Sequence, residues 1–254
     1  MRGSKLAIFD FDGTLFDTRK SIARCINLTF EALAPLHVPD QLAIDTVLAT
    51  GAGLQETFEK LHAITQLSRE DGGPSNSVVS SSVKSPAIQD WITTYRSIYN
   101  SCLSLITPYP DAERVLRNLK ADGCLVVIVS NKGQEAVTTV LKIAKMDDIP
   151  DLVLGETPGL RLKPDPMAYF DIILPRLRLG NTQPDGDQLA YAIPDKVCVI
   201  GDTSADLKFA KNIGAVECWA KYGYGRSEEC VAMKPRITIS CLGDLFQSLK
   251  EILQ

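Results

Sequence analysis

The fold is decided near the N-terminus by the stretch Leu6-Ala7-Ile8-Phe9-Asp10-Phe11-Asp12-Gly13-Thr14-Leu15. It begins with a short apolar run that ends directly in Asp10. A short run without polar alternation is typical of a strand buried on both faces of a parallel sheet. Leu125–Val129, which ends in Ser130, and Val197–Ile200, which ends in Gly201-Asp202, repeat the pattern. We therefore expect three buried parallel strands, each followed closely by polar residues.

Helical patterns separate these strands. Two further segments, Leu152–Leu154 and Val216–Trp219, are weaker strand candidates. The segments with helical spacing are Ala112–Ala121, Glu135–Ala144, Met167–Leu179 and Leu207–Ile213. Strands that alternate with helices predict an α/β fold with a doubly wound parallel sheet. Ligands of such sheets bind beyond the carboxyl ends of the strands, so polar residues placed there are the first candidates for chemistry.

Residues 18–107 interrupt this alternation, because they carry helical patterns and no convincing strand. They predict an all-helical insert in a core domain formed by residues 1–17 and 108–254. Within the insert, residues 69–86 are aperiodic and largely Ser-rich, and we expect a flexible loop there. A second polar insert, residues 180–186, precedes the third strand.

Composition limits the classes of function. The chain has 254 residues, of which 45% are hydrophobic and 23% charged, which fits a soluble globular protein with a sizeable core. No apolar run approaches the roughly 20 residues that span a bilayer, so we expect a cytoplasmic protein with no membrane partner. The net charge is −4 and the sequence has no run of basic residues, so it gives no sign of the positively charged surface that binds nucleic acid. Seven scattered cysteines without a CxxC pair indicate reduced thiols and neither a disulfide framework nor a zinc site.

Two carboxylates, Asp10 and Asp12, follow the first strand, and Gly13 allows a sharp turn after them. One carboxylate can act as a nucleophile and the other as a general acid and base for the leaving and attacking oxygens. Taken alone, the same residues also fit an ordinary turn. Asp202 and Asp206 follow the third strand and open a helix, which they could simply cap. Clustered carboxylates at one sheet edge need a hard cation, and oxygen ligands suit Mg²⁺.

Three further residues can serve an anionic substrate. Ser130 and Asn131 follow the second strand and offer a hydroxyl and backbone N–H groups to a phosphoryl oxygen. Lys163, before a proline-stiffened helix start, supplies a positioned cation. We interpret Lys132, by contrast, as a surface charge.

The four segments that contain these residues together resemble the haloacid dehalogenase superfamily. They begin at Asp10, Ser130, Leu162 and Gly201. The resemblance rests on its DxDGT, Ser/Thr-plus-Asn, lysine and GDxxxD motifs, which occur in this order between about residues 5 and 220. It implies a Rossmann-like core with a helical cap, and an aspartyl-phosphate intermediate on Asp10. It also implies Mg²⁺ held by Asp10, the backbone carbonyl of Asp12 and Asp202, with Asp206 helping through the metal's waters.

Within the superfamily, the chain looks most like the phosphoglycolate phosphatase branch. The stretches that support this resemblance are Pro108-Tyr109-Pro110, Ser130-Asn131-Lys132-Gly133, Leu162-Lys163-Pro164-Asp165-Pro166 and Tyr222-Gly223-Tyr224-Gly225. Thr50-Gly51-Ala52-Gly53-Leu54 resembles the substrate-specificity loop of that branch, although a plain helix break fits almost as well. The substrate-contact residues implied are Thr14, Asn131, Gly51 and Gly53, with Asp10, Asp12, Ser130 and Lys163 as catalytic residues. The predicted function is hydrolysis of a small phosphomonoester by a Mg²⁺-dependent phosphatase.

Several alternatives stay open. A phosphomutase or a pyrophosphatase would use the same scaffold, and a non-catalytic binding protein would retain the fold. A dehalogenase fits poorly, because the family's dehalogenases do not place Asp at the position of Asp12. Phosphoglycolate, a sugar phosphate, a nucleotide, pyrophosphate, or a prenyl or terpenoid phosphate all remain possible substrates. The partner is a small phosphorylated metabolite in each case, and the protein is a monomer or a homodimer.

Overall fold

The computed structural model describes residues 5–70, 86–179, 196–246 and 248. These residues form two compact units. The first comprises residues up to Asp17, Ala49–Gly51, and residues from Thr107 onward, and the second comprises Thr18–Leu48 and Ala52–Ile106. The short segment Ala49–Gly51 therefore groups with the core although it lies inside the predicted insert, and the assignment of residues 18–107 as a separate domain remains a prediction.

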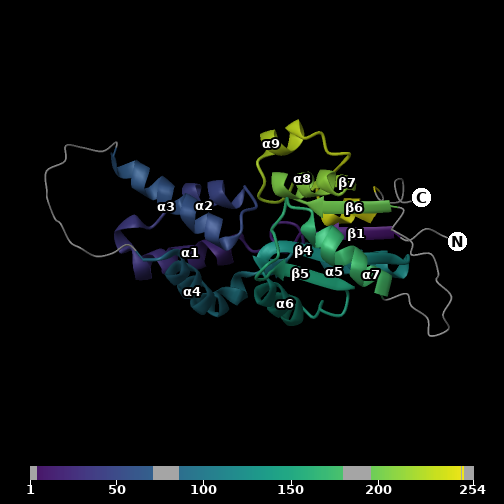
Figure 1. Cartoon of the computed structure of the whole chain (residues 1–254), viewed down its shortest axis with the longest axis horizontal. Helices are drawn as coiled ribbons and strands as arrows, with labels where there is room; N and C mark the ends of the chain where they lie inside the picture. Colours follow the sequence, from purple (N-terminus) through teal and green to yellow (C-terminus); the bar gives the residue numbers. More distant parts are fainter. Residues whose placement is uncertain (1–4, 71–85, 180–195, 247, 249–254) are drawn as a thin grey trace, which may run out of the picture. The chain divides into compact units, whose positions relative to one another are not determined.

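The first unit is built on a six-stranded sheet, in which every strand pair is parallel. Its strands are β5 (Leu152–Glu156), β4 (Cys124–Gly133), β1 (Lys5–Phe9), β6 (Lys196–Gly201), β7 (Val216–Ala220) and β8 (Ile237–Ile239), in this spatial order. Figure 1 shows β1 between β4 and β6. The chain thus adds strands to one side of β1 and then to the other, which is the strand order of a Rossmann-like sheet. The predicted α/β fold is confirmed.

Helices follow the strands along the chain and supply the rest of the core. They are α5 (Ala112–Ala121), α6 (Gln134–Ile143), α7 (Leu174–Leu179), α8 (Ser204–Asn212) and α9 (Ser227–Ala232). Strand residues 0–3% exposed, such as Leu6, Ile8 and Val127, pack against Phe209 of α8 and Ile173. Burial of such side chains contributes roughly 1.5–3 kcal/mol each before chain entropy is subtracted.

The structure differs from the pattern-based expectations in three places. The segment expected as one helix from Met167 divides into a π-helical turn, Ala168–Ile173, and α7. Pro175 lies at this junction, and its missing N–H removes a helical hydrogen bond. Strand β4 continues to Gly133 with an irregularity after Val129. The edge strand β8 was not expected at all.

In its described residues, the second unit consists of helices and 3₁₀ turns, as predicted for the insert. Its helices are α1 (Arg19–Leu33), α2 (Gln41–Leu48), α3 (Leu54–Glu70) and α4 (Ile88–Tyr99), with 3₁₀ turns at Pro35–His37 and Asn100–Leu105. Aromatic rings form its core. The centroid of the Trp91 ring lies 4.6 Å from that of Phe30 and 5.4 Å from that of Phe58. Helix α3 runs to Glu70, so the predicted flexible loop does not begin at residue 69. Most of that loop and the insert at 180–186 lie outside the described residues.

Two short strands mark where the chain leaves and re-enters the first unit. β2 (Phe16–Asp17) pairs antiparallel with β3 (Thr107–Pro108). A further 3₁₀ turn, Leu242–Asp244, follows β8. All seven cysteines lie among the described residues and form no disulfide, as expected. Within the described part of the chain, no helix combines the length and apolarity that a bilayer crossing requires.

Candidate active site

The site is formed where the strand order reverses, beyond the carboxyl ends of β1 and β6. Phe9 and Ile200 are register partners, so the residues that follow them, Asp10 and Gly201-Asp202, leave the sheet side by side. The Asp10 N–H continues the pairing by donating to the Ile200 carbonyl at 2.8 Å. Parallel register therefore brings together two carboxylates that are 192 residues apart in the sequence.

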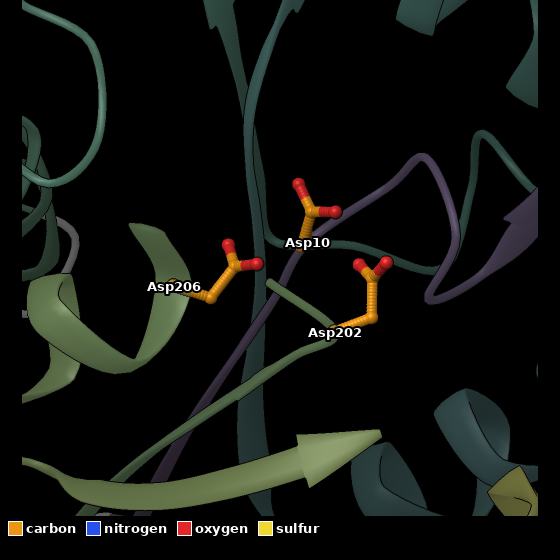
Figure 2. A group of neighbouring side chains, drawn as sticks. All are labelled: Asp10, Asp202 and Asp206. Carbon is orange, nitrogen blue, oxygen red and sulfur yellow. The ribbon is translucent and has the colours of Figure 1, made fainter. Parts of the chain in front are cut away.

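A third carboxylate joins them from the first turn of α8. Each of Asp10, Asp202 and Asp206 offers an oxygen, and these oxygens lie within 4.8 Å of one another. Figure 2 shows the three carboxylates, carried by two strand ends and a helix, turned toward a common space. All three residues are buried. Asp206 also caps α8, because one of its oxygens accepts the N–H and the hydroxyl of Thr203 at 3.0 and 2.7 Å. The Asp206 side chain thus both caps α8 and belongs to the carboxylate cluster.

Lys163 joins two of these carboxylates. Its ammonium donates to Asp10 Oδ1 at 2.6 Å and to Asp206 Oδ1 at 2.7 Å. These are the lengths of strong charge-assisted hydrogen bonds. The Lys163 side chain is only 4% exposed, so water screens this interaction weakly.

Asp202 is held from the other side of the cluster. Its Oδ1 accepts the Thr14 hydroxyl at 3.0 Å, and its Oδ2 accepts the backbone N–H of Tyr224 at 2.7 Å. Two glycines permit this packing. A Cβ on Gly13, whose φ is +83°, would lie 2.4 Å from Asp202 Oδ2, and one on Gly223 would lie 2.3 Å from Asp202 Cβ. Thr14, predicted as a substrate contact, therefore supports a carboxylate in this structure.

The buried cluster is electrostatically unbalanced. Burial raises the pKa of Asp10 well above its usual value; Asp206 and Asp202 raise it further, and Lys163 opposes them. Burial and the charge of Asp206 raise the pKa of Asp202 to about 7. Burial alone would lower the pKa of Lys163, but its two carboxylate partners raise it overall. The site thus resists carrying three negative charges beside one positive charge.

This imbalance fits a divalent cation. Three ionised carboxylates and one ammonium leave two negative charges, which one divalent ion would neutralise. All three carboxylates offer oxygen, the donor that hard cations prefer. The donor set and the charge therefore both match the predicted metal site.

Asp12 lies apart from the cluster and pairs with Lys132. The Lys132 ammonium is 3.3 and 3.4 Å from the two Asp12 carboxylate oxygens, and the lysine side chain is 8% exposed. The interpretation of Lys132 as a surface charge was therefore wrong. The irregular end of β4 turns the chain here, and the Lys132 N–H donates to the Ser130 hydroxyl at 3.2 Å. Bulges near sites commonly redirect one side chain in this way.

Asn131 uses its amide to join two backbone segments. Its Oδ1 accepts the Lys163 N–H at 2.8 Å, and its Nδ2 donates to the Lys163 carbonyl at 3.0 Å and the Gly51 carbonyl at 2.8 Å. The predicted contact residues Gly51 and Asn131 are thus brought together, here as a support for Lys163. Ser130 is 3% exposed at the same strand end.

Gly53, the remaining predicted contact residue, belongs to the second unit. Its carbonyl accepts the N–H and the hydroxyl of Thr57 at 3.0 and 2.9 Å, at the start of α3. The pattern around it also signals a helix start, so its role as a substrate contact remains a prediction.

Comparison with known proteins finds related sequences. The sequence model described as "Haloacid dehalogenase-like hydrolase" matches residues 7–220. The chain is 25% identical to a phosphoglycolate phosphatase of Aquifex aeolicus (strain VF5), over 95% of this chain and 94% of that one. It is 24% identical to the pyrophosphatase PpaX of Bacillus cereus (strain Q1), over 96% of each.

Solved structures share the fold. A predicted phosphoglycolate phosphatase from Haemophilus somnus 129pt superimposes with a TM-score of 0.77 at 21% identity, covering 97% of this chain and 98% of that one. A haloacid dehalogenase-like family hydrolase from Streptococcus pneumoniae gives 0.68 at 19% identity, covering 98% and 100%.

Proposed function

The chain belongs to the haloacid dehalogenase-like hydrolase family, and from this premise we propose that it is a Mg²⁺-dependent phosphatase. It would hydrolyse a small phosphorylated metabolite through a phosphoryl group carried on Asp10. One observation carries the proposal: a buried carboxylate at a strand end, bonded to Lys163 at 2.6 Å and grouped with two further carboxylates. This combination provides a positioned nucleophile beside a cation site.

The residues divide the chemistry between them. An Asp10 oxygen attacks phosphorus, and the bond between phosphorus and the leaving oxygen breaks. Asp12 gives the leaving oxygen a proton, and then takes one from the water that hydrolyses the acyl phosphate, so that inorganic phosphate leaves and Asp10 is restored. The Asp12 side chain is 21% exposed, compared with 10% for Asp10, which suits a group that exchanges protons with water.

Other residues hold these groups in place. Lys163 orients Asp10 and offers positive charge to the phosphoryl oxygens, and Ser130 offers a hydroxyl. Asp10, Asp202 and the Asp12 carbonyl would hold Mg²⁺, with Asp206 a direct ligand or a partner of its waters. The ion would supply positive charge that reduces the repulsion between an anionic nucleophile and an anionic substrate. The helical insert, residues 18–107, would act as a cap that determines which leaving groups are accepted.

The names of two relatives suggest two substrates. The relatives that match nearly the full chain include a phosphoglycolate phosphatase and a pyrophosphatase. We place phosphoglycolate first, because the chain looks most like the phosphoglycolate phosphatase branch. Pyrophosphate comes second, because the same nucleophile and acid can serve an ester and an anhydride.

The test is release of inorganic phosphate from a panel of phosphorylated metabolites, with Mg²⁺ and with EDTA. Asp10→Asn should remove turnover while the protein stays folded by circular dichroism. The matched control is Asp148→Asn, which changes a carboxylate that is 63% exposed and paired with Arg117 outside the site. A folded Asp10→Asn variant with full activity would contradict the covalent mechanism. Sugar phosphate isomerisation without phosphate release would indicate a phosphomutase.

A further inference from the structure

A second lysine, Lys132, whose side chain is 8% exposed, lies beside the proposed acid Asp12. The Lys163 ammonium makes two contacts of 2.6 and 2.7 Å, which are as short as strong ionic hydrogen bonds become. The Lys132 ammonium contacts Asp12 at 3.3 and 3.4 Å. The ion pair between Lys132 and Asp12 is thus longer than either contact of the Lys163 ammonium.

The role proposed for Asp12 gives a reason for the length of this ion pair. To give a proton to the leaving oxygen, the Asp12 carboxyl group must face the substrate as well as Lys132. An ammonium whose side chain is 8% exposed gains much more from an anion than a solvated one does. An anionic group on the substrate could share or take over the contact that Asp12 makes with Lys132.

We propose that Lys132 is a specificity-determining residue that binds a second anionic group on the leaving part of the substrate. The substrate class is then small phosphomonoesters or phosphoanhydrides that carry this anion close to the bridging oxygen. The inference rests on the proposed function, because it places Asp12 at the leaving oxygen.

Distances limit how far the second anion lies from the bond that breaks. Lys132 Nζ is 3.3 Å from Asp12 Oδ1, and a carboxyl oxygen gives its proton across about 2.7 Å. The ammonium is therefore within about 6 Å of the bridging oxygen. Phosphoglycolate, with a carboxylate on the carbon that bears the ester oxygen, meets this limit, and so does pyrophosphate. A long neutral leaving group does not use Lys132.

The experiment compares two substrates that differ only in the anion. Phosphoglycolate and ethyl phosphate are both alkyl esters that need Asp12, but ethyl phosphate has a methyl group in place of the carboxylate. The measurement is the ratio of their kcat/KM values with Mg²⁺ for wild type, Lys132→Met and Lys132→Arg. Any effect of the substitution that acts through Asp12 changes both substrates and cancels in this ratio.

Wild type should prefer phosphoglycolate, and Lys132→Met should lower the preference at least about tenfold, the loss expected for one ionic hydrogen bond. Lys132→Arg, which keeps the charge, should retain part of the preference. The matched control Lys120→Met removes a lysine that is paired with Asp151 away from the site, and it should leave the ratio unchanged. An unchanged ratio in Lys132→Met overturns the proposal.

A binding measurement separates this proposal from the proposed function. Calorimetric titration of the Asp10→Asn protein with each ester, with and without Lys132→Met, needs no turnover. If wild type releases phosphate from neither ester and from nothing else on the panel, the proposed function fails. The Lys132 proposal fails if phosphoglycolate binds no more tightly than ethyl phosphate, or if Lys132→Met leaves the difference unchanged.

Discussion

Replacing Asp202 by Asn is expected to stabilise the metal-free protein, although Asp202 is a proposed metal ligand. Burial and Asp206 raise the pKa of this carboxyl group from 3.8 to about 7. One pKa unit corresponds to about 1.36 kcal/mol. Keeping Asp202 ionised in the folded, metal-free protein therefore costs about 4 kcal/mol at and above neutral pH. An asparagine has the same shape and no charge.

The two hydrogen bonds of this side chain can survive the change. The asparagine oxygen would accept the Tyr224 N–H, and its amide would donate to the Thr14 hydroxyl, which can accept as well as donate. The hydroxyl proton of Thr14 then loses its carboxylate acceptor, at a cost of about 1 kcal/mol. The expected net gain is about 3 kcal/mol in the free energy of unfolding.

Urea unfolding at pH 5 and pH 7.5, in EDTA and in Mg²⁺, measures this gain. Because the folded-state pKa of Asp202 is raised, stability from this group is lost as the pH rises from about 4 to 7. The variant should show a smaller loss over that range. In wild type, Mg²⁺ at one hundred times its Kd should restore about 2.7 kcal/mol, whereas the variant should gain much less. Asp148→Asn should keep the full gain from Mg²⁺.

The electrostatic reasoning is refuted if Asp202→Asn is less stable than wild type in EDTA at pH 7.5 with an unchanged m-value. It is also refuted if both proteins gain equally from Mg²⁺, because the carboxylate would then contribute nothing to the cation site.

Three other substitutions test separate parts of the structure. Asn131→Ala removes three hydrogen bonds that tie Lys163 to Gly51, so it should lower the free energy of unfolding by about 2–4 kcal/mol and lower kcat, as urea unfolding and phosphate release will show. Gly223→Ala would place its Cβ against Asp202, so calorimetry should find weaker Mg²⁺ binding than in wild type; unchanged affinity would contradict the close packing. Trp91→Ala empties the aromatic core of the second unit, where Trp91 is 1% exposed, and should cost about 3–5 kcal/mol in urea unfolding.

The sheet could be predicted from the sequence because strands buried on both faces of a parallel sheet leave continuous apolar runs. Leu6–Phe9 and Val197–Ile200 are such runs, and the structure makes them neighbours. Strand β8 was not predicted, because Ile237-Thr238-Ile239 is short and alternates between apolar and polar residues. Only its two isoleucines are buried. A three-residue edge strand carries too little pattern to be separated from a loop.

The carboxylates of the site were found by their position after the strands, but the groups that hold them were not. Asp202 depends on the backbone N–H of Tyr224, and no side chain signals a backbone donor. Lys132 was misjudged because its burial follows from the irregular end of β4, which the amino-acid pattern does not reveal. Asn131 has the right residue type for a phosphate contact, yet its amide is used by Gly51 and Lys163.

The charge balance of the site explains why its residues oppose the stability of the fold that carries them. Asp10, Asp202 and Asp206 are buried with one bonded cation, Lys163, among them. A core optimised for stability alone would replace at least one carboxylate, since a buried charge without full compensation costs several kcal/mol. The protein instead keeps all three: parallel register places Asp10 and Asp202, which Thr14 and the turn at Tyr224 support, and helix α8 carries Asp206. A divalent cation bound between these carboxylates would recover the free energy lost in the metal-free protein, so the excess negative charge that weakens the fold is also what would favour binding of a cation.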